Sequence, residues 1–415
     1  MLLCALAACS RAPAASTPST ARGSVDELRA LGYSGVASEA SDDRRTGVVF
    51  ADPARTSPGY NLTSVSKFCT ADLFDSSGEL VHRWHDPTQR AWDHVELLPD
   101  GDLLVVGSDR GERKFAGALC EDHYVQRFAF DGSTRWKLAA RAHHDVQVMW
   151  NGDFLTLTAD QRELPAVDTE HEVIDNRFTR ISPDGKVLEE LSLYDLCSKP
   201  ESKFVFQKVA PNPNKQFPII DYFHANSIEF MRDPALHGTH PIFAPHNVLV
   251  SMRHQDCIAV FDWDRQVVVW QWGRGELSGP HDARVLPNGH VLVFDNGIDR
   301  RWTRIVEVDP ATGAIVWSYH DPVDRSRFFS LSQGASQRLP DGNTLIADSN
   351  SGRAFEVTPT GEKVWEYLVP HFDERGRRAE IYRIRRYAPE FVEPILAAHA
   401  SMASGEADAA APTAK

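Results

Sequence analysis

Short apolar runs alternate with polar turns along most of the chain, and each turn leads back into a second apolar run. Six segments share this pattern, at residues 71–84, 126–136, 179–191, 258–272, 304–319 and 354–367. Period-two alternation bounded by Gly-, Asp- and Asn-rich turns is typical of β-hairpins. The spacing of roughly 50 residues between copies indicates a repeat architecture.

A second repeat with a polar beginning precedes most of these hairpins. It is clearest at residues 281–297, which read HDARVLPNGHVLVFDNG, and it recurs from Trp92, His143 and Gly334. Each unit then has a head strand, an LPDG- or LPNG-like turn and three further strands. Four antiparallel strands per unit at this spacing predict an all-β fold, a six-bladed β-propeller that spans residues 46–390.

The number of strands predicts how the ring closes. There are six outer sets of three strands, the first from Tyr60, but only five head strands. Residues 379–389, AEIYRIRRYAP, form a strand-like run after the last blade and can supply the sixth head. We therefore expect a C-terminal strand to close the ring and remove the exposed sheet edges. Bulky rings that fill the gaps between neighbouring blades are expected at Trp136, Trp270, Trp317 and Trp365.

The two ends of the chain have a different composition. Residues 1–9 resemble a lipoprotein-type signal that ends in Leu-Ala-Ala-Cys, so Cys9 is the expected lipidation site. This interpretation places the protein in the periplasm, anchored by lipid to the outer membrane, and the alternative is an Ala-rich cytosolic start. We expect residues 10–45 to be a flexible tether and residues 391–415 to be a disordered tail.

Charge and cysteine content limit the partners. The formal net charge is -14 and the pI is about 5.6, which argues against a nucleic-acid partner. Beyond the signal, the cysteines are Cys69, Cys120, Cys197 and Cys257. A bridge between Cys120 and Cys197 is compatible with an oxidising periplasm, and buried free thiols are the alternative.

The head strands of a propeller line its central channel, so their first residues converge at one mouth. The polar residues at this register are Asp93, His94, His144, His224, Asn226 and His281. Arg253, Asn296 and Arg300 follow second strands and can reach the same mouth. Neutral imidazoles with arginines favour a sulfate or phosphate ester. Because the chain has no HExxH or CxxC spacing, we expect neither a required metal nor a cofactor.

Three segments carry a resemblance to a known family. DYFHANSIEF at 221–230, GPHDARVLPNGHVLVFDNGIDRR at 279–301 and QRLPDGNTLIADSNSGRAFEVTPTGEKVWEY at 337–367 are similar to motifs of the bacterial arylsulfotransferases. The resemblance covers about residues 45–390. It implies a six-bladed propeller and PAPS-independent transfer of a sulfuryl group from a phenolic sulfate ester to a phenol. In this family a histidine becomes transiently sulfated.

The resemblance also implies roles for individual residues. His224 and His281 match two of the family's active-site histidines, and Arg300 after FDNG matches its arginine. The family's nucleophile belongs to the head of the last blade, where this chain has Gln333 and Gly334. We expect His281 or His224 to act as nucleophile or general base while Arg300 holds the sulfonate oxygens. His144 and Asp93 are further candidates.

Two other classes of function remain open. One is a non-catalytic propeller that binds an anionic or sulfated ligand, because the last blade lacks the histidine. The other is a quinoprotein-like dehydrogenase, which only the Trp-bearing repeats suggest, and a fold alone is no evidence for a function.

Overall fold

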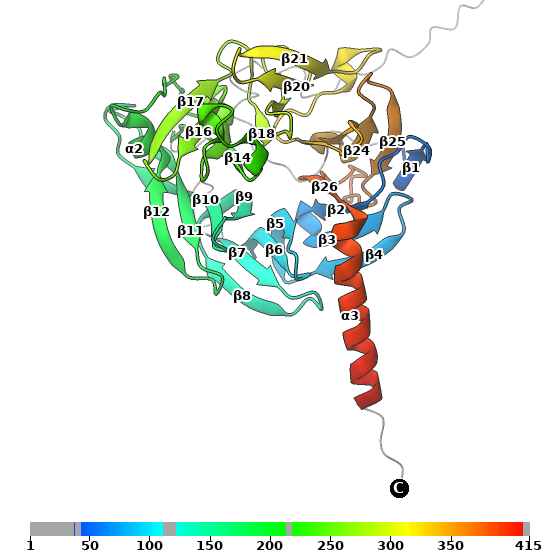
Figure 1. Ribbon diagram of the computed structural model, residues 1–415. Coiled ribbons are helices and arrows are strands. Elements are labelled where there is room, and N and C mark those ends of the chain that lie inside the picture. Colours follow the sequence, from blue (N-terminus) through cyan, green and yellow to red (C-terminus); the bar gives the residue numbers. More distant parts are fainter. Residues whose placement is uncertain (1–36, 38–42, 111–121, 213–217, 410–415) are drawn as a thin grey trace, which may run out of the picture.

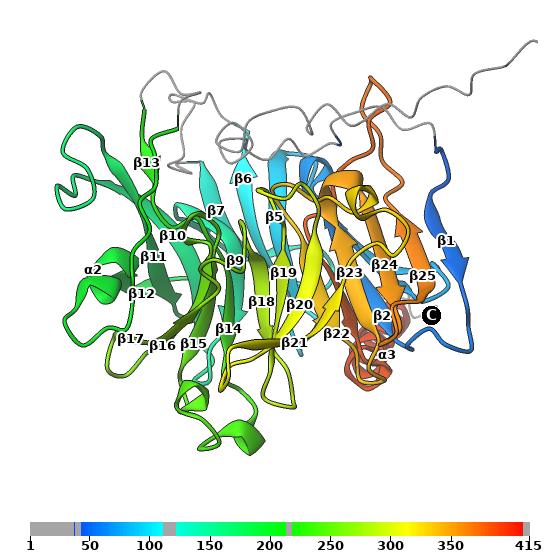
Figure 2. The ribbon, with the colours of Figure 1, turned by 90° about the horizontal axis from the view of Figure 1, so that it is seen from above.

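The computed structural model describes residue 37 and residues 43–110, 122–212 and 218–409. In these residues the strands form six antiparallel blades around one axis (Figure 1), which confirms the predicted six-bladed propeller. Figure 2 shows the same ring from the side, with the strands running roughly from one face of the disc to the other.

The strands of each blade follow here from the channel outward. Blade 1 has β26 (Ile384–Tyr387), β2 (Tyr60–Val65), β3 (Thr70–Asp75) and β4 (Leu80–His85), and blade 2 has β5 (Gln89–Leu97), β6 (Leu103–Asp109), β7 (His123–Phe128) and β8 (Thr134–Ala139). Blade 3 has β9 (Ala142–Val148), β10 (Phe154–Arg162), β11 (Val173–Ile181) and β12 (Val187–Ser192), and blade 4 has β14 (Ala225–Phe230), β15 (Val248–Met252), β16 (Cys257–Asp262) and β17 (Val267–Trp272). Blade 5 has β18 (His281–Val285), β19 (Val291–Asp295), β20 (Arg304–Asp309) and β21 (Ala314–Tyr319), and blade 6 has β22 (Ala335–Arg338), β23 (Thr344–Asp348), β24 (Arg353–Val357) and β25 (Lys363–Leu368).

Further elements lie at the edges of this ring. β1 (Gly47–Ala51) pairs antiparallel with β25, and β13 (Ile220–Asp221) pairs parallel with β11. In the part of the chain that the structure describes, the α-helices are α2 (Leu193–Ser198) and α3 (Pro389–Ala409). Short 3-10 turns are η2 (Ser66–Phe68), η3 (Pro234–Leu236), η4 (Pro241–Phe243), η5 (Arg253–Gln255), η6 (Arg325–Arg327) and η7 (Ser349–Ser351).

Ring closure follows the prediction. β26 pairs antiparallel with β2 and places Tyr387 opposite Tyr60 and Ile384 opposite Thr63. The C-terminal segment therefore supplies the inner strand of the first blade. β1 adds a second tie, because the N-terminal strand covers the outer edge of blade 6. This second tie was not predicted.

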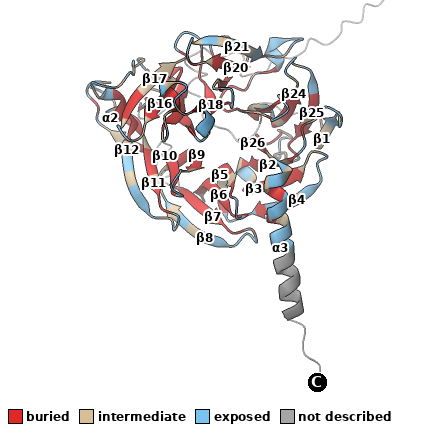
Figure 3. Cartoon of the chain, in the orientation of Figure 1, coloured by how far each residue is buried: buried red, intermediate tan, exposed pale blue. Residues whose placement is uncertain are grey.

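In the described residues, six hydrophobic clusters lie one at each boundary between neighbouring blades, and a small seventh contains Ile298 and Leu331. Burial is nearly complete along the inner and middle strands and is lost on the outer strands (Figure 3). Each apolar sheet face thus packs against the face of the next sheet, which is how a closed array buries its surface.

Tryptophans on the outer strands of five blades join each of them to the next blade, whereas β12 of blade 3 has no tryptophan. The indole N–H of Trp136 donates to the Pro183 carbonyl at 2.9 Å, and the indole of Trp317 donates to the Pro359 carbonyl at 2.9 Å. Trp365 of the last blade reaches the Ser76 carbonyl of the first blade at 2.8 Å. Trp84 and Trp272 make equivalent bonds, to the backbone carbonyls of Ala129 and Gly313 in the next blade. In blade 4 this indole belongs to Trp272, while Trp270 packs against the cluster between blades 4 and 5.

Below the mouth, a buried network of charges fills the channel. Arg383, just before β26, lies 3.3 Å from Asp145 of blade 3 and 3.2 Å from Asp282 of blade 5. Arg284 lies 2.6 Å from Asp282 and 3.4 Å from Asp145. All four side chains are buried. Charges in such a place are stable only when paired, so each blade that supplies one depends on the others.

The C-terminal prediction was wrong in part. Residues 391–409 were expected to be disordered, but they belong to α3. The reason is an apolar stripe. Val392 and Ile395 are buried in the cluster between blades 1 and 2, and the partly buried Phe391 and Leu396 pack against it. Burial of these apolar side chains stabilises the helix although its composition is of low complexity.

The structure also decides between the cysteine alternatives where it describes them. Cys69, Cys197 and Cys257 are free and buried, so the expected possibility of a bridge to Cys197 is not realised. Cys120 lies outside the described residues, as do the proposed lipidation site Cys9, the signal and nearly all of the tether. Among the described residues, no helix combines the length and the apolar character needed to span a bilayer.

Ring closure makes a testable prediction. A chain that ends at Val369 lacks β26 and loses the pairing with β2 and the charges of Arg383, so we expect it to be insoluble or unfolded. A chain that ends at Pro389 keeps β26 and loses only the helix, and we expect it to fold with a lower Tm. Circular dichroism during heating distinguishes these results, and cooperative unfolding of the shorter chain would contradict closure by β26.

Candidate active site

Strained backbone marks the start of the inner strand in successive blades. His144, His224 and Asp282 have φ values of 67°, 49° and 47°, in the left-handed region that side chains other than Gly rarely adopt. Such residues cost on the order of 1 kcal/mol each and cluster at functional sites. Here the turn aims two imidazoles at the channel mouth instead of into the sheet.

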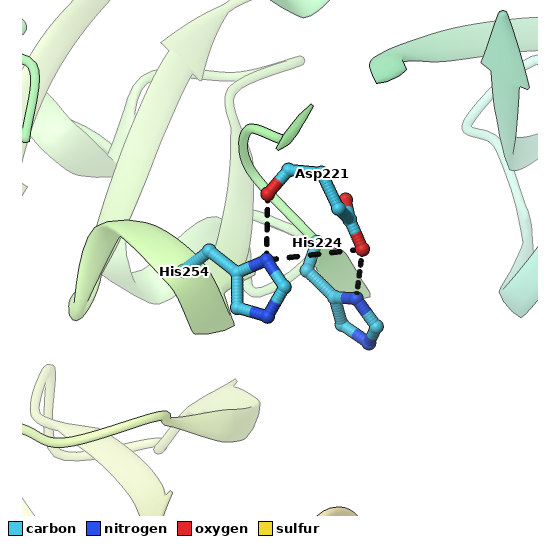
Figure 4. A group of neighbouring side chains, drawn as sticks. All are labelled: Asp221, His224 and His254. Atoms are coloured by element: carbon cyan, nitrogen blue, oxygen red, sulfur yellow. Dashed lines mark hydrogen bonds and ion pairs between the residues drawn. The ribbon is translucent and has the colours of Figure 1, made fainter. Parts of the chain in front are cut away.

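A carboxylate holds the first of these imidazoles. Asp221 ends β13, and its Oδ2 lies 2.5 Å from Nδ1 of His224 (Figure 4). The parallel pairing of β13 with β11 places Asp221 beside the start of β14. Because a carboxylate accepts, His224 carries its proton on Nδ1, and in the neutral ring the basic lone pair is then on Nε2.

His254 binds to the same aspartate from the adjacent turn η5. Its Nδ1 lies 2.6 Å from the backbone carbonyl of Asp221 and 3.8 Å from Oδ2 of this residue. Arg253 Nη1 donates to Nε2 of His254 at 3.0 Å. The rings of His254 and His224 are 4.7 Å apart. The guanidinium of Arg253 is thereby brought into the cluster.

His144 joins the cluster from blade 3. Its ring lies 5.0 Å from that of His224, edge to face. Its Nδ1 is 2.6 Å from Nδ1 of His143, whose Nε2 is 3.1 Å from the Asn176 amide nitrogen. Tyr382, two residues before β26, lies 6.3 Å from His144 between ring centres.

His281 is oriented by the loop that follows β19. Its Nδ1 lies 2.8 Å from Oδ1 of Asn296, and the Asn296 amide donates to the carbonyls of Ser330 and Gln333. The Asn296 oxygen is therefore the acceptor, and His281 carries its proton on Nδ1. This arrangement gives Asn296 a positioning role next to the imidazole.

Burial favours the neutral form of His143, His144, His254 and His281. It lowers the pKa of His143, His254 and His281 to about 3, and it lowers the pKa of His144 well below its usual range. Burial alone would raise the pKa of Asp221, but His224 and His254 outweigh it, so the pKa falls below its ordinary value. The site thus combines neutral imidazoles with one charged carboxylate and the guanidinium of Arg253.

Asp221, His224 and His254 also have the composition of a metal site, with ligand atoms within 4.8 Å of one another. Their hydrogen bonds favour another interpretation. A metal on Nδ1 of His254 would displace its bond to the Asp221 carbonyl and move the proton to Nε2, where it would face the N–H of Arg253. The positive charge of Arg253 also disfavours a dication.

The residues predicted from the sequence divide into three groups. His144, His224, Arg253 and His281 lie in one cluster, with Asn296 beside His281. Asn226 bonds to the Pro280 carbonyl and links blades 4 and 5. The other predicted residues have contacts elsewhere, as described next.

His94 lies deeper in the channel, where its Nε2 is 3.3 Å from Asp145 and Arg383 donates to its Nδ1. Asp93 accepts a bond from the Ser66 hydroxyl. Arg300 folds over Trp302 and lies 2.9 Å from Asp295.

The last blade shows why no histidine occupies residue 334. Gly334 has φ of 150°, and a Cβ there would lie 2.1 Å from the Phe294 ring. Gln333 instead donates to the buried Glu380 at 3.1 Å.

Several residues of the cluster were missed. Asp221 lies in the two-residue strand β13, His254 in the turn η5, and Asn176 on β11, the third strand of blade 3, so none of them belongs to a head strand. His143 was visible as the neighbour of His144, and the doubled histidine was the available signal.

Comparison with known proteins adds independent information. The pattern of the arylsulfotransferase (ASST) family matches residues 129–369, more than half of the chain. The chain belongs to this family. The matched region contains His143, His144, His224, His254 and His281, together with Asp221 and Asn176.

Other comparisons are more distant. No curated protein matches significantly. A protein of unknown function from Bacteroides caccae is similar over 79% of this chain and 98% of its own, with 14% identity and a TM-score of 0.47. Virginiamycin B lyase from Staphylococcus aureus is similar over 80% of this chain and 91% of its own, with 11% identity and a TM-score of 0.42.

The neutral imidazoles predict an acid-sensitive fold. An unfolded histidine takes up a proton near pH 6.5, whereas His281 in the folded protein does so only near pH 3. Its contribution to stability is complete above pH 6.5 and is lost as the pH falls towards 3, with a slope of up to about 1.4 kcal/mol per pH unit. In urea unfolding between pH 6 and 4, His281→Gln should therefore show a shallower decrease in the free energy of unfolding. Equal slopes for the two proteins would contradict this account.

The hydrogen-bond interpretation of Asp221 also predicts how the protein responds to chelators. We expect dialysis against EDTA to leave the Tm unchanged, because His224 and His254 already donate hydrogen bonds to Asp221. Elemental analysis by mass spectrometry provides the check. One equivalent of zinc in the native protein that is lost in Asp221→Asn would show that a metal centre is present.

Proposed function

We propose that this ASST-family propeller transfers a sulfuryl group from a phenolic sulfate ester to a phenol without PAPS, through His224. The supporting observation is the Asp221–His224 pair at the mouth, with an Nδ1 to Oδ2 distance of 2.5 Å. A carboxylate that orients a basic imidazole is the arrangement of an activated nucleophile. It takes the place of the histidine that the last blade lacks.

In the first step, the lone pair on Nε2 of His224 forms a bond to sulfur while the bond from sulfur to the phenolic oxygen breaks. The electron pair of that bond leaves on the phenolate. The sulfated ring gains positive charge, and the Asp221 carboxylate at Nδ1 stabilises it electrostatically. In the second step the oxygen of the acceptor phenol bonds to sulfur while the bond between sulfur and Nε2 of His224 breaks. The electron pair of that bond returns to Nε2, and the proton of the phenol passes to Nε2 of His281.

The sulfonate oxygens need cationic and N–H donors. Arg253 supplies the positive charge, because it is buried and bonded to His254 next to His224. Arg300 remains a predicted second guanidinium, and it would have to leave its contact with Asp295 to reach the mouth. His281, whose Nδ1 is held by Asn296, directs Nε2 as a base for the acceptor phenol.

The second candidate function is a propeller that binds a sulfated or other anionic ligand without turnover. One observation favours it: the last blade presents Gln333 and Gly334 where the family's nucleophile belongs. Under this alternative the same imidazoles and Arg253 would hold the ester as hydrogen-bond partners only.

An assay with 4-nitrophenyl sulfate and excess phenol distinguishes these functions. We expect nitrophenolate release that depends on phenol, and a loss of at least about 100-fold in kcat/KM for His224→Ala, the size of one lost catalytic group. Asp221→Asn should lose activity with little change in KM, because it removes orientation and charge rather than substrate contacts.

The control is His290→Ala, since His290 pairs with Glu307 outside the cluster. Full activity in His224→Ala would refute the proposed nucleophile. Saturable binding without release in the native protein would favour the alternative.

A further inference from the structure

We propose that His144 presents an N–H to the site, fixed by a chain of hydrogen bonds through Asn176 and His143, and that this N–H stabilises the leaving phenolate. The catalytic part of the inference rests on the proposed sulfuryl transfer. The direction of the hydrogen bonds is independent of that function, because it follows from the donors and acceptors of the backbone and side chains.

The chain starts at a backbone group whose polarity cannot change. The N–H of Ala225 donates to Oδ1 of Asn176 at 2.8 Å, between blades 4 and 3. With its oxygen used as acceptor, the Asn176 amide turns its NH2 group to Nε2 of His143, at 3.1 Å. An amide NH2 can only donate, so Nε2 of His143 accepts.

The next bond follows from this one. A neutral His143 that accepts at Nε2 carries its proton on Nδ1, which lies 2.6 Å from Nδ1 of His144. Two nitrogens at this distance share one proton, so Nδ1 of His144 accepts. His144 must then carry its own proton on Nε2.

The neighbouring imidazoles have the opposite polarity. His224 donates from Nδ1 to Asp221, and His281 donates from Nδ1 to Asn296. Their Nε2 atoms are basic, whereas Nε2 of His144 is a donor. The edge-to-face contact of the two rings, with centres 5.0 Å apart, places the donor ring of His144 beside the proposed nucleophile.

A neutral imidazole can act as an electrophile without giving up its proton. When Nε2 of His224 bonds to sulfur, the electron pair of the breaking bond goes to the phenolic oxygen. The N–H of His144 stabilises that charge by a hydrogen bond, and the phenolate takes its proton later from water. Asn176 and His143 act through His144 and are therefore positioning residues.

One other group competes for the same proton. The backbone carbonyl of Thr158 also faces the ring of His143. If Nε2 of His143 donated to this carbonyl, both imidazoles would reverse, and His144 would present a lone pair. The direct test is the tautomer of each ring.

Ring-nitrogen NMR of the protein labelled with 15N-histidine measures these tautomers without any assay of activity. We expect His144 to be protonated on Nε2 and His143, His224 and His281 on Nδ1, with the His144 signals assigned by their loss in His144→Gln. Protonation of His144 on Nδ1 would overturn the proposal even if the protein is an active transferase.

Asn176→Asp tests the role in catalysis. A carboxylate at this position accepts from the Ala225 N–H and from Nε2 of His143. Nδ1 of His143 is then the acceptor, so His144 should become protonated on Nδ1 and donate to it. Turnover of phenyl sulfate, whose leaving group is more basic, should then fall about tenfold more than turnover of 4-nitrophenyl sulfate, because charge on the leaving oxygen loses its donor.

The matched control is Asn61→Asp, which makes the same buried Asn-to-Asp change in blade 1. There Arg386 donates to Oδ1 of Asn61. This control should leave the ratio of the two rates unchanged. Equal losses for both substrates in Asn176→Asp would show that the residue is only structural. The native protein's tautomers decide the first part of the proposal even if Asn176→Asp does not fold.

Discussion

The structure depends on the ion pairs that Arg383 forms at the centre of the ring. This guanidinium comes from the last segment of the chain and lies between Asp145 and Asp282, which belong to the third and fifth blades. None of these charges is stable in a buried channel without the others. The closing strand therefore brings more than backbone pairing with β2. It completes a charge network that requires the first, third and fifth blades to be in place.

This network also shapes the site above it. His94 and Asp145 are used inside the network, so the channel is filled with paired charges below the mouth. The histidines at the mouth lie over this filled centre, where burial keeps them neutral. A cluster of uncharged rings beside Arg253 has both donors and acceptors for an ester anion. The hydrogen bonds of the Ala225 N–H and the Asp221 carbonyl determine which ring nitrogens carry protons and which accept.

In the proposed mechanism, Asp221 reconciles membership of the arylsulfotransferase family with a last blade that has no histidine at its head. The Phe294 ring leaves no room for a side chain at Gly334, so that blade cannot offer an imidazole at this residue. The aspartate from β13 holds His224 at the start of blade 4. The proposal therefore places the nucleophile on another blade, whose inner strand also begins at the channel.

The amino-acid sequence by itself determined the propeller, its six blades and the closing role of residues 379–389, because hairpin turns and period-two alternation are local signals that repeat. It also placed His144, His224 and His281 at one register. The helix at 389–409 was missed because its stability comes from Val392 and Ile395 packing on blades 1 and 2, and not from its own composition.

Only the tertiary structure decided which polar residues meet. Asp221, Asn176 and His254 are in different blades or turns, and their roles arise from hydrogen bonds that join distant segments. Arg300 and His94 match the repeat as well as the clustered residues do, but Asp295 and Asp145 hold them elsewhere. A register in the sequence determines which strand bears a side chain. The direction of that side chain depends on the partner that satisfies it.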